Sequence, residues 1–263
     1  GIELDVTHRE FFQGLTQNNS IKKIKLLCNG RYTLGRPVIQ EILKAYWKIG
    51  NNNLVDLSID SINLQNGEED VLATTLVSCV NLTKLSLTNS GISNDEQQLH
   101  VFVDALRGND SLEVLELRGN RIGDAGCVIL SDLLFTNLQV LRLADNGIGN
   151  NGAITIANNL AFIDNNKLRE LILTRNAIDI NASTAYSRLL CNTSSINQTS
   201  SSNHTLHKLF LPEHVDNLNY LLKMNRERNK SYVAMRKILK YHPKIDMKPF
   251  FGWDAEGEWT LKG

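Results

Sequence analysis

One pattern of apolar residues recurs along this chain and constrains its fold more than any other feature. The pattern has apolar residues at its first, fourth and sixth positions, an Asn at the ninth and an apolar residue at the eleventh. Three copies, at 112–122, 138–148 and 168–178, match all five positions. Weaker copies begin at Ile21, Leu54, Leu82 and Leu206. Degraded outer copies are expected because terminal repeats cap an array of repeats.

The spacing within the pattern predicts a short strand followed by a turn. The fourth and sixth positions are two residues apart, so in a strand both side chains point to the same face. Stacked strands of this kind build a parallel sheet with a column of Leu and Ile on its inner side. We expect the Asn to satisfy backbone groups buried in the turn, because its amide both donates and accepts hydrogen bonds.

The distance between successive copies leaves room for a helix. The interval is 30 residues from Leu82 to Leu112, 26 to Leu138 and 30 to Leu168. Apolar residues at helical spacing lie between the strands, at Leu72, Thr75, Leu76 and Cys79, at Leu99, Phe102, Val103 and Leu106, and at Ala153, Ile156, Ala157 and Leu160. Val38, Ile42, Ala45 and Tyr46 are spaced similarly, after a Pro37 placed to start a helix. The sequence therefore predicts an α/β solenoid of about seven repeats.

The segment SLEVLELRGNRIGDAGCVILSDLL, at residues 111–134, resembles a ribonuclease-inhibitor-type leucine-rich repeat. The Gly-Asp-Ala-Gly stretch at 123–126 and the helix expected after it are similar to that subtype, and the resemblance covers roughly residues 21–213. It implies a horseshoe with parallel strands on the concave face and helices on the convex face, which binds protein partners through its concave face or its rims. The whole chain is also similar to a large set of microalgal proteins of this class, which implies no particular activity. The architecture serves many unrelated partners, so it is specific for fold and not for function.

The segments outside the regular repeats divide the chain into three parts. Residues 1–20 are expected to form an N-terminal capping helix, residues 21–213 the repeat array, and residues 214–263 C-terminal capping helices with a basic, aromatic tail. The stretch 191–205 breaks the period and is rich in Ser, Asn and Thr, so we expect an inserted, mobile polar loop. The loop is either a tolerated insertion or a contact for a partner.

The formal net charge of the chain is zero, but its charges are distributed unevenly along the sequence. Residues 223–248 hold nine Lys or Arg against two acidic residues, whereas the remainder holds 19 basic and 26 acidic residues. One interpretation of this segment is a solvated capping helix in which Tyr232, Met235 and Leu239 pack inward. The other is docking onto an acidic partner or, less favoured, RNA.

No motif indicates catalysis. The chain has no phosphate loop, nucleophile elbow or dinucleotide fingerprint, so we expect neither an enzyme nor a cofactor. His204, His207 and His214 have no Cys or carboxylate at ligand spacing, so no metal site is predicted. The widely spread Cys28, Cys79, Cys127 and Cys191 are interpreted as small buried hydrophobes, which fits a reducing, intracellular compartment such as cytoplasm, nucleus or an organelle. No apolar run approaches the ~18 residues of a membrane span.

The best candidate surface is the concave face of the sheet. Its first row is predicted to contain Lys25, Ser58, Ser86, Glu116, Arg142, Ile172 and Phe210. Arg and aromatic residues are enriched at interface hot spots, and the predicted partner site comprises Glu116, Arg118, Arg142, Asp145, Ile172, Arg175 and Phe210. An ordinary solvated sheet face is the alternative, because exposed strand charges also discourage nonspecific pairing. The predicted function is a scaffold or adaptor that binds protein partners. The alternative is an accessory subunit of a large complex, docked by its basic C-terminal tail.

Overall fold

The computed structural model describes residues 21–27, 53–61, 64, 68–92, 96–162, 167–212, 216–244, 251–253 and 259–261. The capping helix predicted within 1–20 and the helix predicted after Pro37 lie outside these residues. Seven parallel strands form one sheet in the order β1 to β7, each strand pairing with the next along the chain. The strands are β1 (Lys23–Leu27), β2 (Asp56–Asp60), β3 (Lys84–Thr88), β4 (Val114–Glu116), β5 (Val140–Arg142), β6 (Glu170–Ile172) and β7 (Lys208–Phe210).

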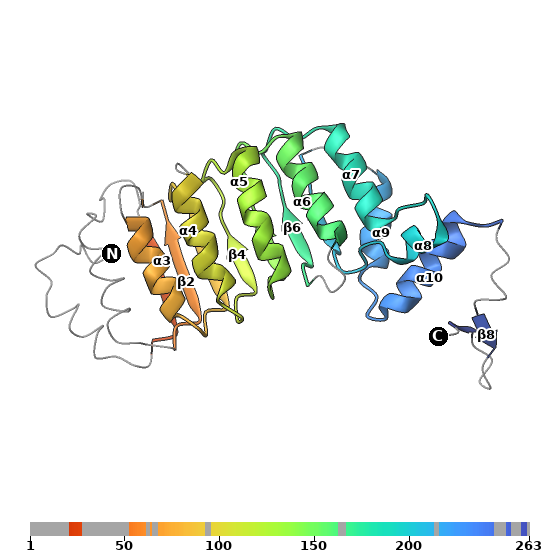
Figure 1. Cartoon of the computed structure of the whole chain (residues 1–263), viewed down its shortest axis with the longest axis horizontal. Helices are drawn as coiled ribbons and strands as arrows, with labels where there is room; N and C mark the ends of the chain where they lie inside the picture. Colours follow the sequence, from red (N-terminus) through yellow and green to blue (C-terminus); the bar gives the residue numbers. More distant parts are fainter. Residues whose placement is uncertain are drawn as a thin grey trace, which may run out of the picture.

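From β2 to β7, helices connect successive strands and stand side by side in one layer (Figure 1). They are α3 (Glu68–Ser78), α4 (Glu96–Arg107), α5 (Gly123–Leu130), the 3-10 turn η1 (Ser131–Phe135), α6 (Asn150–Phe162) and α7 (Ile180–Leu190). Beyond them lie α8 (Ile196–Ser200), α9 (Asp216–Met224), α10 (Lys230–Tyr241) and the antiparallel pair β8 (Phe251–Trp253) and β9 (Trp259–Leu261). This arrangement confirms the predicted α/β solenoid, with its parallel strands alternating with helices.

The core lies between the sheet and the helix layer. The repeated apolar positions of the strands and of the helix stripes are almost fully buried, as at Leu115, Leu117 and Leu141 on the strand side and Phe102 and Leu160 on the helix side. Burying such a side chain contributes roughly 1.5–3 kcal/mol, so stacking of repeats provides most of the stability of the array. Cys79, Cys127 and Cys191 are buried, as predicted, and Cys28 lies outside the described residues.

The Asn residues of the pattern, Asn120, Asn146 and Asn176, form a row of hydrogen-bonded side chains in the turns after the strands, which we call the Asn ladder. In Asn146, Nδ2 donates to the Leu117 carbonyl at 2.9 Å and Oδ1 accepts from the Asn120 backbone N–H at 2.8 Å. Asn120 and Asn176 make the equivalent contacts one repeat away. Each Asn therefore links two adjacent turns, which confirms the predicted role. Ser90 occupies the same position and reaches the Ile59 and Thr88 carbonyls with its shorter side chain.

The structure of residues 191–205 differs from the one predicted. It was expected to be a mobile polar loop, but it contains α8, whose Thr199 is fully buried, and α8 packs against α10. The Thr199 hydroxyl donates to the Asn192 carbonyl at 2.8 Å, and Oδ1 of Asn203 accepts from the Leu206 backbone N–H at 2.9 Å. Its polar side chains thus satisfy buried backbone groups where the array ends.

The face of α10 that packs inward also differs from the prediction. Of the three residues predicted to pack inward, Tyr232 and Leu239 are exposed and Met235 is half-buried. The buried residues of this helix include Val233, Lys237 and Ile238. The Lys237 ammonium donates to the carbonyls of Leu190 at 2.5 Å and Asn203 at 3.1 Å, and to Nδ1 of His204 at 2.9 Å. Three acceptors from the insertion and the last repeat helix therefore draw this lysine into the core. Desolvation lowers the pKa of Lys237 to about 7.

Candidate functional site

The exposed side of the sheet is built from two rows of residues. The strand register aligns Lys25, Ser58, Ser86, Glu116, Arg142, Ile172 and Phe210, in the order predicted from the sequence. Two residues earlier on each strand, a second row runs through Lys23, Asp56, Lys84, Val114, Val140, Glu170 and Lys208. Because side chains alternate along a strand, both rows point away from the buried Leu column.

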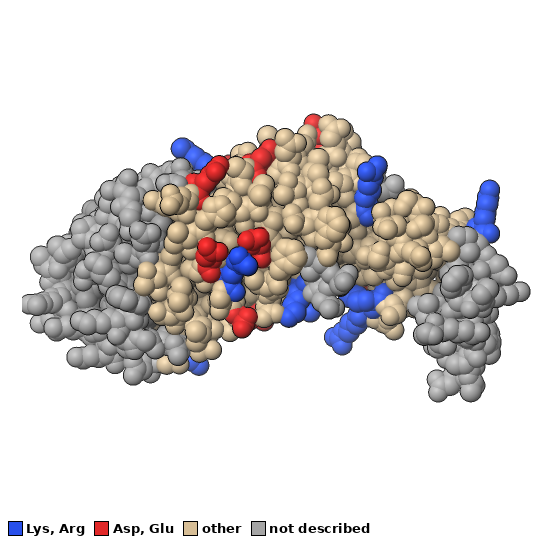
Figure 2. All heavy atoms as spheres, in the orientation of Figure 1, with Lys and Arg blue, Asp and Glu red and all other residues tan. Residues whose placement is uncertain are grey.

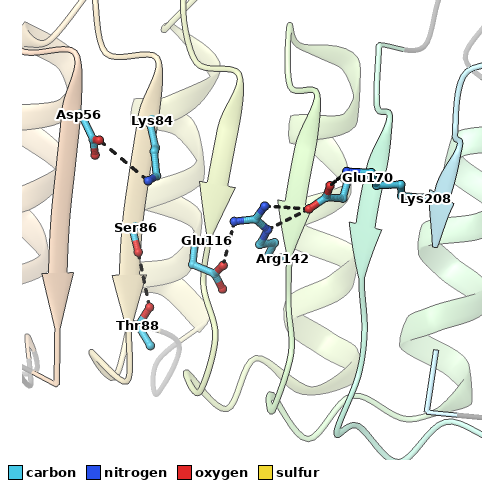
Figure 3. A network of polar contacts seen from close by, with 8 residues as sticks. All are labelled: Asp56, Lys84, Ser86, Thr88, Glu116, Arg142, Glu170 and Lys208. Atoms are coloured by element: carbon cyan, nitrogen blue, oxygen red, sulfur yellow. Dashed lines mark hydrogen bonds and ion pairs between the residues drawn. The ribbon is translucent and has the colours of Figure 1, made fainter. Parts of the chain in front are cut away.

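Charges on this face alternate in sign from one strand to the next (Figure 3). We call the set the charge ladder, and it comprises Asp56, Lys84, Glu116, Arg142, Glu170 and Lys208 from β2 to β7. Its centre is Arg142, which donates from Nε and Nη2 to Oε1 of Glu170 at 3.0 and 2.8 Å and lies 3.7 Å from Glu116. The Lys208 ammonium binds the other Glu170 oxygen at 3.0 Å. Lys84 and Asp56 are 3.9 Å apart.

The two glutamates of the ladder have different electrostatic environments. Burial by itself would raise the pKa of Glu170, but hydrogen bonds from Arg142 and Lys208 outweigh burial, so the pKa is lowered. For Glu116, burial is the larger effect and raises the pKa, although attraction to Arg142 partly offsets it. The network is therefore held most firmly on the β6 side, where a carboxylate shared by two cations stays ionised.

The predicted site residues do not form one group. Glu116 and Arg142 are in contact, and Ile172 and Phe210 continue the same row. Three of the seven lie beyond the strand ends and are exposed: Arg118, Asp145 and Arg175. Among them, Asp145 and Arg175 adopt left-handed backbone conformations, with φ of 60° and 57°, where a non-glycine residue is uncommon.

The structure adds two residues that the sequence analysis missed. Glu170 and Lys208 belong to the row two residues earlier on the strand. Glu170 binds the Arg142 guanidinium, and Lys208 binds the other oxygen of the same carboxylate. The alternation of strand side chains could have identified them, because 170 and 172 must share a face. Arg142, which the sequence places in the predicted partner site, is therefore already paired within the chain.

The basic C-terminal segment separates into groups with different environments. Lys237 is buried, Lys230 donates to the Asn225 and Glu227 carbonyls at 2.8 Å each, and Lys240 lies 3.4 Å from the centroid of the Tyr220 ring. Four others lie around one cavity of about 630 Å³: Lys223, Arg226, Arg228 and Arg236. Lys244 is exposed, and Lys248 lies outside the described residues.

The histidines considered in the sequence analysis make separate contacts in the part of the chain described. Nδ1 of His204 accepts from Lys237, whereas His207 contacts its neighbouring Thr205 carbonyl, and His214 lies outside the described residues. Among the described residues, no three His, Cys, Asp or Glu side chains are arranged to hold a metal ion. No helix within the same residues combines the length and apolar character needed to cross a membrane.

Two segments of the chain, residues 108–131 and 136–157, match a family model described as Leucine Rich repeat. No curated protein sequence matches the chain. Among solved structures, a chain described as Leiomodin-1 Actin-Binding Site 2 (ABS2) is similar at 16% identity and a TM-score of 0.44, over 65% of this chain and 94% of that one. The matched segments hold two of the three complete copies of the pattern, together with β4, α5 and β5. The repeats of this chain form an α/β fold of the leucine-rich-repeat type.

Proposed function

We propose that the chain is a non-catalytic protein-interaction module, a scaffold or adaptor that binds its partner through the exposed face of the sheet. The observation that carries this proposal is the position of Phe210. Its side chain is 44% exposed on β7, at the end of the row that continues through Ile172 to Arg142. Aromatic residues and arginine, which this row presents two strands apart, are enriched at the centres of protein interfaces.

The charge ladder favours a protein partner over a nucleic acid. Its three cations alternate with three carboxylates, so the ladder itself has no net positive charge to attract phosphates. Arg142 and Glu170 are also held in one geometry before any partner arrives. Such preorganisation lowers the entropy lost on binding, and the alternating signs give a partner of complementary pattern a defined register.

The partner site that we propose extends the predicted one. Its centre consists of Glu116, Arg142, Ile172 and Phe210. Glu170 holds Arg142 in place, and Lys208 in turn binds Glu170. Arg118, Asp145 and Arg175 form an exposed rim where the strands end. We also propose that the repeats are of the ribonuclease-inhibitor type, because full helices such as α4 and α6 occupy the return path between the strands.

Affinity capture with quantitative mass spectrometry tests the proposal. The full chain is compared with Phe210→Ser and with the matched control Phe162→Ser, which removes a ring that is 82% exposed on the helix layer. Each captured protein is then purified and its Kd measured by titration calorimetry. We expect Phe210→Ser to raise the Kd of at least one direct partner about thirtyfold, a loss of about 2 kcal/mol of binding free energy that is typical of a hot spot. The control variant should leave the Kd of that partner unchanged. Equal Kd values for both variants and the wild type would contradict the proposal.

A further inference from the structure

The C-terminal cap carries a second charged surface whose organisation differs from that of the charge ladder. The four cations Lys223, Arg226, Arg228 and Arg236 surround a cavity of about 630 Å³ between the end of α9, the following turn and α10. We call this group the basic cavity. On the described C-terminal part of the face shown in Figure 2, basic side chains are seen without acidic ones. The volume lies within the ~300–1,000 Å³ range of ligand-binding sites.

The charge of the basic cavity is not neutralised within the part of the chain that is described. No ion pair there involves any of its four cations, in contrast to Arg142 and Lys208 on the sheet. The one acidic residue lining the cavity is Glu227, and its Oε1 accepts from the backbone N–H groups of Arg228 at 2.7 Å and Asn229 at 3.4 Å. Like charges that line one cavity repel one another, so an anion that enters the cavity is favoured.

The backbone that carries the cations is fixed by local hydrogen bonds. The side chain of Asn229 caps α10 by accepting from the Tyr232 N–H at 3.0 Å, and Lys230 binds the carbonyls of Asn225 and Glu227. The buried Lys237 anchors the same helix to Leu190 and Asn203. The cations are therefore presented from a rigid support, which reduces the entropy cost of binding.

We propose that the basic cavity binds an acidic segment of a protein partner, with Asp or Glu carboxylates paired to the guanidinium groups. Arginine suits this task because its planar fork hydrogen-bonds both oxygens of a carboxylate. Single-stranded RNA fits less well, since it needs free aromatic faces for base stacking, and one face of Tyr220 is covered by the Lys240 ammonium at 3.4 Å from the ring centroid. This site is separate from the sheet face and does not depend on the function proposed for it.

Fluorescence anisotropy with the full chain and a fluorescein-labelled octaglutamate peptide tests the inference at low salt, where such pairing is least screened. Arg226→Gln combined with Arg228→Gln removes two exposed cations of the cavity. Lys22→Gln combined with Lys244→Gln is the matched control, because it removes two exposed cations that do not line the cavity. We expect saturable binding by the wild type, about tenfold weaker binding by the cavity variant and less than twofold change in the control.

Three outcomes would overturn the inference. They are no saturable binding of octaglutamate, equal weakening by the cavity variant and its control, and tighter binding of an octauridine RNA than of the peptide. Phe210→Ser separates this site from the proposed function, because its ring lies on β7 rather than at the cavity. We expect that variant to bind octaglutamate as the wild type does, whatever it does to capture of the partner.

Discussion

Removal of one Asn side chain tests how the repeats are held together. Asn146 is 1% exposed and makes four hydrogen bonds, two from Nδ2 to the Leu117 and Ala144 carbonyls and two to Oδ1 from the N–H groups of Asn120 and Ile122. In Asn146→Ala all four are lost. Each neutral hydrogen bond contributes about 1 kcal/mol net, and an orphaned buried N–H costs about 1–3 kcal/mol more. We therefore expect the free energy of unfolding to fall by about 3 kcal/mol or more.

Urea denaturation followed by far-UV circular dichroism measures this loss at 25 °C. The matched control is Asn158→Ala, which removes an exposed amide from α6 and should change stability by less than about 0.5 kcal/mol. Asn176→Ala should fall between the two, because Asn176 is only partly buried and water can replace some of its contacts. A loss below about 1 kcal/mol for Asn146→Ala, or one equal to the control, would refute the proposed role of the ladder of Asn residues.

Two further perturbations follow from the charged groups. Glu170→Gln should lower the free energy of unfolding by about 1 kcal/mol at pH 7. Because the pKa of Glu170 is lowered in the folded protein, this difference between variant and wild type should disappear as the pH falls through that pKa. Urea denaturation measures it, with Asp104→Asn at an exposed helix position as the control. Between about pH 7 and 10 the unfolded chain holds a proton on Lys237 that the folded chain has lost, so stability should rise from pH 7 to pH 9 in the wild type and rise less in Lys237→Met. Identical pH slopes for these two proteins would show that Lys237 is not the group responsible.

The strands and the Asn ladder could be predicted because they depend on local spacing alone. The apolar positions of the three complete copies specify which side chains face the core, and the structure buries them. The position of the Asn relative to the strand likewise indicated its partners. The register across the sheet follows from the equivalence of the repeats, which aligns Glu116 with Arg142.

The C-terminal cap could not be predicted in the same way, because its packing depends on groups distant in the sequence. Lys237 would be assigned to a solvated face by any rule based on composition. It is buried because the carbonyls of Leu190 and Asn203 supply partners 47 and 34 residues away. Once this lysine is buried, Val233 and Ile238 share its face, and Tyr232 and Leu239 must point outward. The insertion was misjudged for the same reason, since its polar side chains satisfy buried backbone groups.

The strand register confirms the predicted row of side chains from Glu116 to Phe210, whereas its role as a partner site stays a prediction. The sequence placed Arg142 on the exposed face but could not reveal that two glutamates and a lysine form one network around it. That network depends on side-chain rotamers and on the lateral distance between parallel strands, which are properties of the assembled sheet. In the proposed function, the charged part of the face would provide complementarity and the exposed ring of Phe210 the apolar anchor.

Site-specific photo-crosslinking tests the central claim most directly. A p-benzoylphenylalanine at position 210 probes the exposed face of the sheet, and the same residue at position 162 probes the helix layer. Irradiation in cell extract followed by mass spectrometry identifies the adducts of each. We expect one or a few proteins to crosslink at 210 and not at 162, with their adducts lost when Arg118 and Arg142 are reversed in charge. Identical adduct profiles at both positions, or adducts at 162 alone, would contradict the assignment of the sheet face as the binding surface.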